Sequence, residues 1–125
     1  MTKRILVADD EIFMHRLLQY HLRQAGYEVV TAENGREAVE KAAQEKPHLV
    51  VLDVMMREMD GLAALKELSQ TETTREIPVI MMTASAQVTR QQAEACGAAG
   101  FFTKPFSPTQ LMLEIKRLLM ERAPT

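Results

Sequence analysis

The sequence predicts an α/β fold in which a parallel sheet is covered by helices on both faces. Short apolar runs alternate five times with longer segments of helical period along the 125 residues. The first and third runs are continuously apolar, as expected for parallel strands buried on both faces. Such an alternation implies right-handed crossovers between parallel strands. Because no repeat or composition shift marks a linker, we expect one domain spanning residues 1–125.

Five runs have the length and composition of buried strands. They cover residues 4–8, 28–31, 49–52, 78–82 and 100–103.

Five segments between and after these runs have helical period. The first spans about residues 11–25, stops at Gly26 and carries an apolar stripe that includes Met14, Leu18 and Leu22. The last begins at Pro108, a residue suited to a first helical turn. The others cover about residues 35–45, 61–69 and 87–96, and the last helix covers about 108–121.

Composition excludes several classes of function. The formal net charge of −2 gives no basic surplus for direct nucleic-acid binding. A single cysteine, Cys96, cannot form an intramolecular disulfide. No apolar run approaches the roughly 20 residues needed to cross a membrane, and the N-terminal run is too short for a secretory signal. We therefore expect a cytoplasmic protein without membrane contact.

Polar side chains gather where the predicted strands end. Ligands of open parallel sheets lie beyond the carboxyl ends of the strands. The first, third, fourth and fifth strands end in Asp9-Asp10-Glu11, Asp53, Thr83 and Lys104-Pro105, respectively. Acids, a hydroxyl and a lysine are therefore expected at one rim of the sheet.

This set of residues favours metal-assisted phosphoryl chemistry. Crowded carboxylates repel one another, and a divalent cation removes that repulsion. Oxygen ligands without a neighbouring His or Cys favour Mg²⁺ (or Mn²⁺) over zinc or copper. Asp53 lies centrally, so its carboxylate can attack phosphorus and form an acyl phosphate. Thr83 and Lys104 can hold the phosphoryl oxygens.

At these residues the chain resembles the receiver domain of bacterial two-component response regulators, of the chemotaxis-regulator type. Four motifs carry the resemblance, and they occur in order, each at a strand end. They are Asp9-Asp10-Glu11, the segment from Asp53 to Gly61, Thr83-Ala84, and Phe102-Thr103-Lys104-Pro105-Phe106. The likeness extends from Lys3 to about Arg122.

The resemblance implies a flavodoxin-like, three-layer sandwich with strand order 2-1-3-4-5. It also implies that a histidine kinase or a histidine phosphotransfer protein donates the phosphoryl group to Asp53. Phosphorylation would then switch the surface of the fourth helix, fifth strand and fifth helix for an unknown downstream protein or a C-terminal effector domain.

The same resemblance assigns roles to single residues. Asp10 and Asp53 would bind the metal directly, Asp9 mostly through water, and Met55 through its backbone carbonyl. Thr83 and Lys104 would hold phosphoryl oxygens. Two further assignments are a cis peptide bond between Lys104 and Pro105, and an aromatic switch at Phe101 that turns inward as Thr83 moves toward the phosphate.

The sequence departs from the family pattern at two places. Arg57 replaces the usual proline four residues after the acceptor, a change expected to affect rates. Ala99 and Gly100 stand where many DNA-binding members carry an acidic pair, which argues against dimerisation through that charge network.

Three other functions remain open on the sequence alone. A small Mg²⁺-dependent phosphatase with an aspartyl nucleophile would usually need a cap, and no insertion is long enough to form one. A flavin or nucleotide binder would need a glycine-rich phosphate loop, which is absent. A degenerate receiver would act by protein contact only, although every active-site position is filled.

Overall fold

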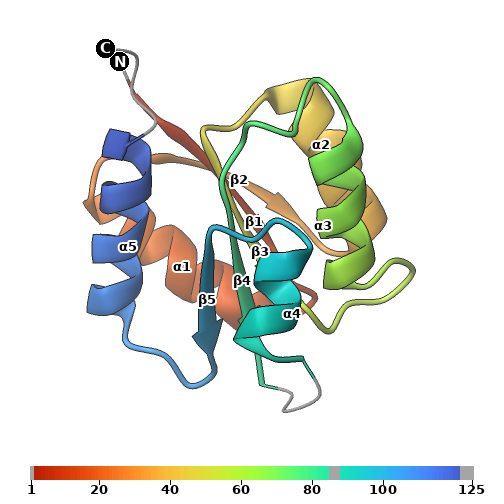
Figure 1. Ribbon diagram of the computed structural model, residues 1–125. Helices are drawn as coiled ribbons and strands as arrows, with labels where there is room; N and C mark the ends of the chain where they lie inside the picture. Colours follow the sequence, from red (N-terminus) through yellow and green to blue (C-terminus); the bar gives the residue numbers. More distant parts are fainter. Residues whose placement is uncertain (1, 85–87, 122–125) are drawn as a thin grey trace.

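The computed structural model describes residues 2–84 and 88–121 and contains one parallel sheet flanked by helices (Figure 1). The strand order is β2-β1-β3-β4-β5. The strands are β1 (Arg4–Ala8), β2 (Glu28–Ala32), β3 (Leu49–Asp53), β4 (Val79–Thr83) and β5 (Gly100–Thr103). The helices are α1 (Ile12–Gln24), α2 (Gly35–Glu45), α3 (Gly61–Gln70), α4 (Arg90–Ala95) and α5 (Pro108–Glu121). The predicted fold class and strand order are confirmed.

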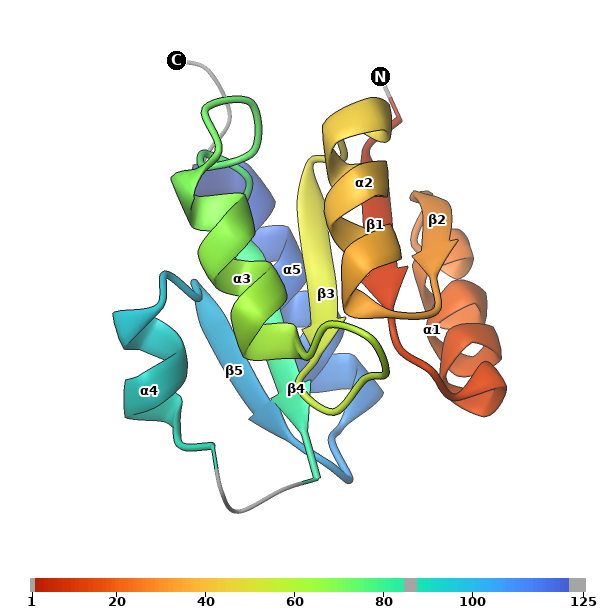
Figure 2. The same cartoon turned by 90° about the vertical axis from the view of Figure 1, so that its right-hand side faces the viewer.

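The helices form two layers, one on each face of the sheet. Helices α1 and α5 cover one face, and α2, α3 and α4 cover the other (Figures 1 and 2). Successive side chains of a strand point to opposite faces. In β1, Leu6 and Ala8 accordingly join the core under α2 and α3, while Ile5 and Val7 join the core under α1 and α5. Alternation along a continuously apolar strand thus supplies both cores.

Several element boundaries differ from those expected from the sequence. Strands β3 and β4 each extend one residue further, because Asp53 pairs with Met82 and Thr83 pairs with Thr103. Strand β2 likewise continues to Ala32. Strand β4 starts one residue later, at Val79.

The expected start of the fourth helix is wrong. Residue 87 lies outside the described part of the chain, but Val88 and Thr89 precede the helix, and α4 begins at Arg90. Thr89 forms a capping box, in which its side-chain oxygen accepts a hydrogen bond from the Gln92 backbone N–H at 3.1 Å. This cap fixes the start of the helix after, not before, Val88.

Among the helices of the described segments, none has both the length and the apolar character that a membrane-spanning helix requires.

Candidate functional site

The carboxyl ends of β1 and β3 place two buried acids side by side. Asp9 directly follows β1, and Asp53 is the last residue of β3, the neighbouring strand. The Asp9 backbone N–H donates a hydrogen bond to Ala32 O at 3.1 Å, which holds Asp9 against the end of β2. Asp9 is fully buried and Asp53 is 3% exposed. Both carboxylates are therefore placed by the ends of two adjacent strands.

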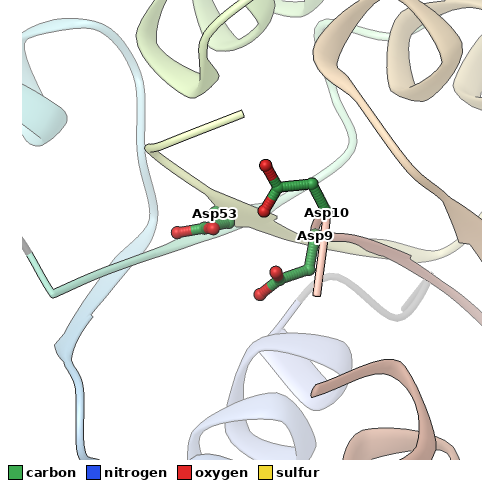
Figure 3. A group of neighbouring side chains, drawn as sticks. All are labelled: Asp9, Asp10 and Asp53. Atoms are coloured by element: carbon green, nitrogen blue, oxygen red, sulfur yellow. The ribbon is translucent and has the colours of Figure 1, made fainter. Parts of the chain in front are cut away.

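A third acid completes the cluster. Asp10 is partly exposed, and one carboxylate oxygen from each of Asp9, Asp10 and Asp53 lies within 4.8 Å of the others. Figure 3 shows the three side chains converging on one region at the end of the sheet. Hard oxygen donors in this number fit Mg²⁺ or a similar cation.

Lys104 is bound to this acidic cluster. Its ammonium nitrogen lies 3.0 Å from Asp9 Oδ2, 3.5 Å from Asp53 Oδ2 and 3.7 Å from Glu11 Oε1. The Lys104 side chain is only 12% exposed and both Asp9 and Asp53 are buried, so these two ion pairs are weakly screened. Glu11 is exposed, so its pair with Lys104 is screened by water. Lys104 bridges the two buried carboxylates and offsets part of their repulsion.

Backbone contacts hold Lys104 in place. Its N–H donates to Thr83 O at 2.8 Å, which ties the residue after β5 to the last residue of β4. The Lys104–Pro105 peptide bond is cis.

The environment perturbs the acid–base chemistry of the site. Burial first, and then the negative charge of Asp9, raise the pKa of Asp53, which in total moves from 3.8 to about 6. Lys104 and the backbone N–H of Met55 act in the opposite direction. Burial alone would lower the pKa of Lys104, but its hydrogen bond to Asp9 and the nearby acids outweigh that effect and raise it. Asp53 is therefore a carboxylate held in an unfavourable environment, and Lys104 stays charged.

The remaining predicted residues have distinct placements. Thr83 is fully buried at the end of β4, beside β5. Phe101 is 7% exposed and belongs to the core under α2, α3 and α4. The Met55 side chain is 58% exposed in the loop after β3, and its backbone N–H is hydrogen-bonded to Asp53. Arg57 lies in the same loop and is exposed.

Two contacts in this region were not anticipated from the sequence. Glu11 was seen at the strand end, but its ion pair with Lys104 was not anticipated. Arg90, which contacts Phe101, follows a segment whose local pattern gives no indication of such a contact. Only the three-dimensional packing of α4 on β5 reveals it.

The sequence matches a known protein family. The family model described as the response regulator receiver domain matches residues 5–116. The chain belongs to the response regulator receiver family. Receiver domains are signalling modules, and the relatives and solved structures described next are regulators and receiver domains.

Curated relatives of this receiver are transcriptional regulators. The chain is 42% identical over 120 residues to the alkaline phosphatase synthesis transcriptional regulatory protein PhoP of Bacillus subtilis, covering 95% of this chain and 49% of that protein. It is 46% identical over 118 residues to the probable transcriptional regulator ycf27 of Cyanophora paradoxa, covering 94% and 48%, respectively. The chain thus spans about half the length of the curated relatives it matches.

Solved receiver structures have the same fold. The chemotaxis response regulator CheY4 of Vibrio cholerae superposes with a TM-score of 0.86 at 31% identity, covering 94% of this chain and 99% of that one. The receiver domain of sensor histidine kinase PA1611 of Pseudomonas aeruginosa superposes with a TM-score of 0.88 at 26% identity, covering 96% and 99%. The latter structure has a magnesium ion coordinated in its active-site cleft.

Proposed function

We propose that this receiver accepts a phosphoryl group on Asp53 in a Mg²⁺-dependent reaction and that the phosphorylated form signals to a downstream partner. One observation carries the proposal. The buried Asp53 carboxylate lies within 4.8 Å of oxygens from two further acids and 3.5 Å from the Lys104 ammonium nitrogen. A nucleophile with a cation-binding acid pair and a fixed positive charge beside it suits transfer of an anionic group.

The metal would be held by Asp9, Asp10, Asp53 and the backbone carbonyl of Met55. Mg²⁺, or Mn²⁺ in its place, would neutralise negative charge on the reacting carboxylate and phosphoryl oxygens. The cluster of oxygen donors supports this assignment.

The protein's own side chains account for the rest of the reaction. An oxygen of Asp53 attacks phosphorus, the bond from phosphorus to the donor's leaving atom breaks, and an acyl phosphate forms. Lys104 neutralises a phosphoryl oxygen, and the Thr83 hydroxyl donates a hydrogen bond to another. Thr83 and Asp53 are buried and the Lys104 side chain is only 12% exposed, which strengthens these electrostatic contacts.

The donor would be a histidine kinase or a histidine phosphotransfer protein in the cytoplasm. The output surface would comprise α4, β5 and α5, with Thr83 and Phe101 as the switch. A groove of about 500 Å³ lies on this surface, between Arg90 of α4, Phe101 of β5 and Gln110 of α5. The downstream target would be a separate protein or an effector domain. Residues 1–125 would act as one receiver domain that does not itself bind nucleic acid.

Intact-mass spectrometry tests the central step. Incubation with acetyl phosphate and Mg²⁺ should add the mass of one phosphoryl group, and chelation of the metal should prevent the addition. Asp53→Asn should stay unmodified, whereas Glu33→Gln, a matched change of an exposed acid, should react like the wild type. An unmodified wild-type protein, or an equally modified Asp53→Asn variant, would overturn the proposal.

A further inference from the structure

Arg90, the first residue of α4, makes two contacts with Phe101 of β5. Its guanidinium donates a hydrogen bond to Phe101 O at 3.0 Å. Its guanidinium carbon also lies 5.6 Å from the centre of the Phe101 ring, within the range of a cation–π contact. A planar guanidinium can stack on the ring and donate to the carbonyl from one rigid group, which suits both contacts better than an ammonium group does. One side chain therefore holds both the backbone and the ring of Phe101.

These contacts join two lightly held elements. Within the described residues, strand β5 lies at the edge of the sheet, with β4 as its neighbour. Helix α4 spans six residues, and Ala93 is its only buried residue. Because α4 buries only Ala93, the two contacts of Arg90 form a tie that adds to a limited apolar packing between this helix and β5.

The tie lies next to the chemistry proposed above. Thr83 pairs with Thr103, two residues beyond Phe101 on the same strand. Lys104, one residue further, donates its backbone N–H to Thr83 O at 2.8 Å. Any movement of Thr83 or Lys104 toward a phosphoryl group therefore acts on the strand that Arg90 holds.

We propose that Arg90 is a positioning residue that keeps the Phe101 ring buried before phosphorylation and so favours binding of a phosphoryl group at Asp53. This inference rests on the proposed function. Phe101 is already 7% exposed in this structure, with Arg90 over its ring. If the buried ring is the form that matches a bound phosphoryl group, coupling must be reciprocal, and loss of the tie weakens phosphoryl binding.

The position of the ring can be measured without any phosphorylation. Protein labelled with 4-fluorophenylalanine gives signals from four phenylalanines, and Phe101→Leu identifies that of Phe101. In the wild type, a dissolved paramagnetic agent should barely broaden this ¹⁹F signal. In Arg90→Met, which keeps a long apolar side chain, the ratio of exposed to buried ring should rise about five-fold, from loss of one hydrogen bond and one cation–π contact.

Two matched variants distinguish loss of the Arg90–Phe101 contacts from a general loss of positive charge. Arg90→Lys keeps the charge but not the planar fork, and should give an intermediate broadening. Arg75→Met removes an exposed arginine outside α4, β5 and α5, and should leave the Phe101 signal unchanged. Equal protection of Phe101 in wild type and Arg90→Met would overturn the proposal.

The coupling is measured with beryllofluoride and Mg²⁺ as the phosphoryl probe. Arg90→Met should bind beryllofluoride more weakly than wild type, by the factor by which its fraction of buried ring falls in the ¹⁹F measurement, while Arg75→Met should match the wild type. An exposed ring with unchanged beryllofluoride affinity would overturn the coupling. An exposed ring in Arg90→Met, with no beryllofluoride binding by the wild type, would instead contradict the proposed function and leave the placement of Phe101 by Arg90 standing.

Discussion

The Asp53 side chain is less stable as a carboxylate in the folded protein than in water. Burial and the negative charge of Asp9 raise its pKa from 3.8 to about 6, despite the Lys104 ammonium nitrogen at 3.5 Å. The folded state therefore binds a proton at Asp53 more tightly than the unfolded state does. Stability contributed by this group rises as the pH falls from 6 toward 3.8, and near neutral pH the buried charge is a cost. At neutral pH the fold therefore holds an ionised Asp53 at a cost in stability, which a bound cation would offset.

Replacing the carboxylate should therefore stabilise the protein when metal is removed. We expect Asp53→Asn to raise the free energy of unfolding by about 1–3 kcal/mol at about pH 7.5 in the presence of a chelator. The gain should shrink as the pH falls below 6 and largely vanish near 4, because wild-type Asp53 is then protonated in the folded state. Urea unfolding at a series of pH values measures this difference.

Glu33→Gln, which removes an exposed acid, provides the control for this series. A stability gain in Asp53→Asn that is absent, or that stays constant from pH 7.5 to about 4, would show that the fold does not strain this carboxylate.

At the scale of elements, the segment between β3 and α3 fixes the position of the Asp53 backbone at the end of β3. The Gly61 N–H donates to Val54 O at 2.8 Å, and the Asp60 side chain caps α3 by accepting from the Ala63 N–H at 2.8 Å. A Cβ on Gly61 would lie 2.2 Å from Asp53 O and 2.7 Å from Val54 Cα. These are backbone atoms, so the turn has no flexible side chain that could give way.

Gly61→Ala should therefore be strongly destabilising. We expect a loss of about 2–4 kcal/mol in the free energy of unfolding, together with slower phosphorylation from acetyl phosphate, because the backbone of Asp53 must move. Ala63→Gly, at an exposed position of the same helix, tests helix propensity alone and should cost about 1 kcal/mol. Equal losses for the two variants in urea titrations would mean that the close approach at Gly61 has no special effect.

The sequence predicted the elements of the site better than the contacts within it. Strand ends are visible as apolar runs followed by polar residues, so Asp9, Asp53 and Lys104 could be placed at one rim. The ion-pair partner of Lys104 could not be predicted from strand ends alone. Its 3.0 Å contact with Asp9 depends on how the two side chains are oriented, and they follow β5 and β1, which are not neighbouring strands. The start of α4 at Arg90 was also missed, since a capping box competes with helical periodicity over a short segment.

At the scale of the whole molecule, the strand order explains why the acidic cluster exists only in the folded chain. Strands β1 and β3 are neighbours in the centre of the sheet, although residues 9 and 53 are far apart in sequence. The unfolded chain cannot hold Asp9, Asp10 and Asp53 within 4.8 Å of one another, so a cation that uses all three must bind the native state preferentially.

Mg²⁺ should therefore raise the melting temperature of this receiver in a concentration-dependent manner. At a free concentration of 100 times Kd, linkage predicts about 2.7 kcal/mol of added stability, or a shift of several degrees for a domain of this size. Thermal unfolding followed by circular dichroism and by tyrosine fluorescence should give coincident single transitions, because both cores lie on one sheet. Asp10→Asn should lose most of the Mg²⁺-dependent shift, while Glu33→Gln should keep it. Equal shifts in Asp10→Asn and wild type would place Mg²⁺ outside the acid cluster, and a wild-type melting temperature independent of Mg²⁺ would mean that the three converging carboxylates do not bind the ion.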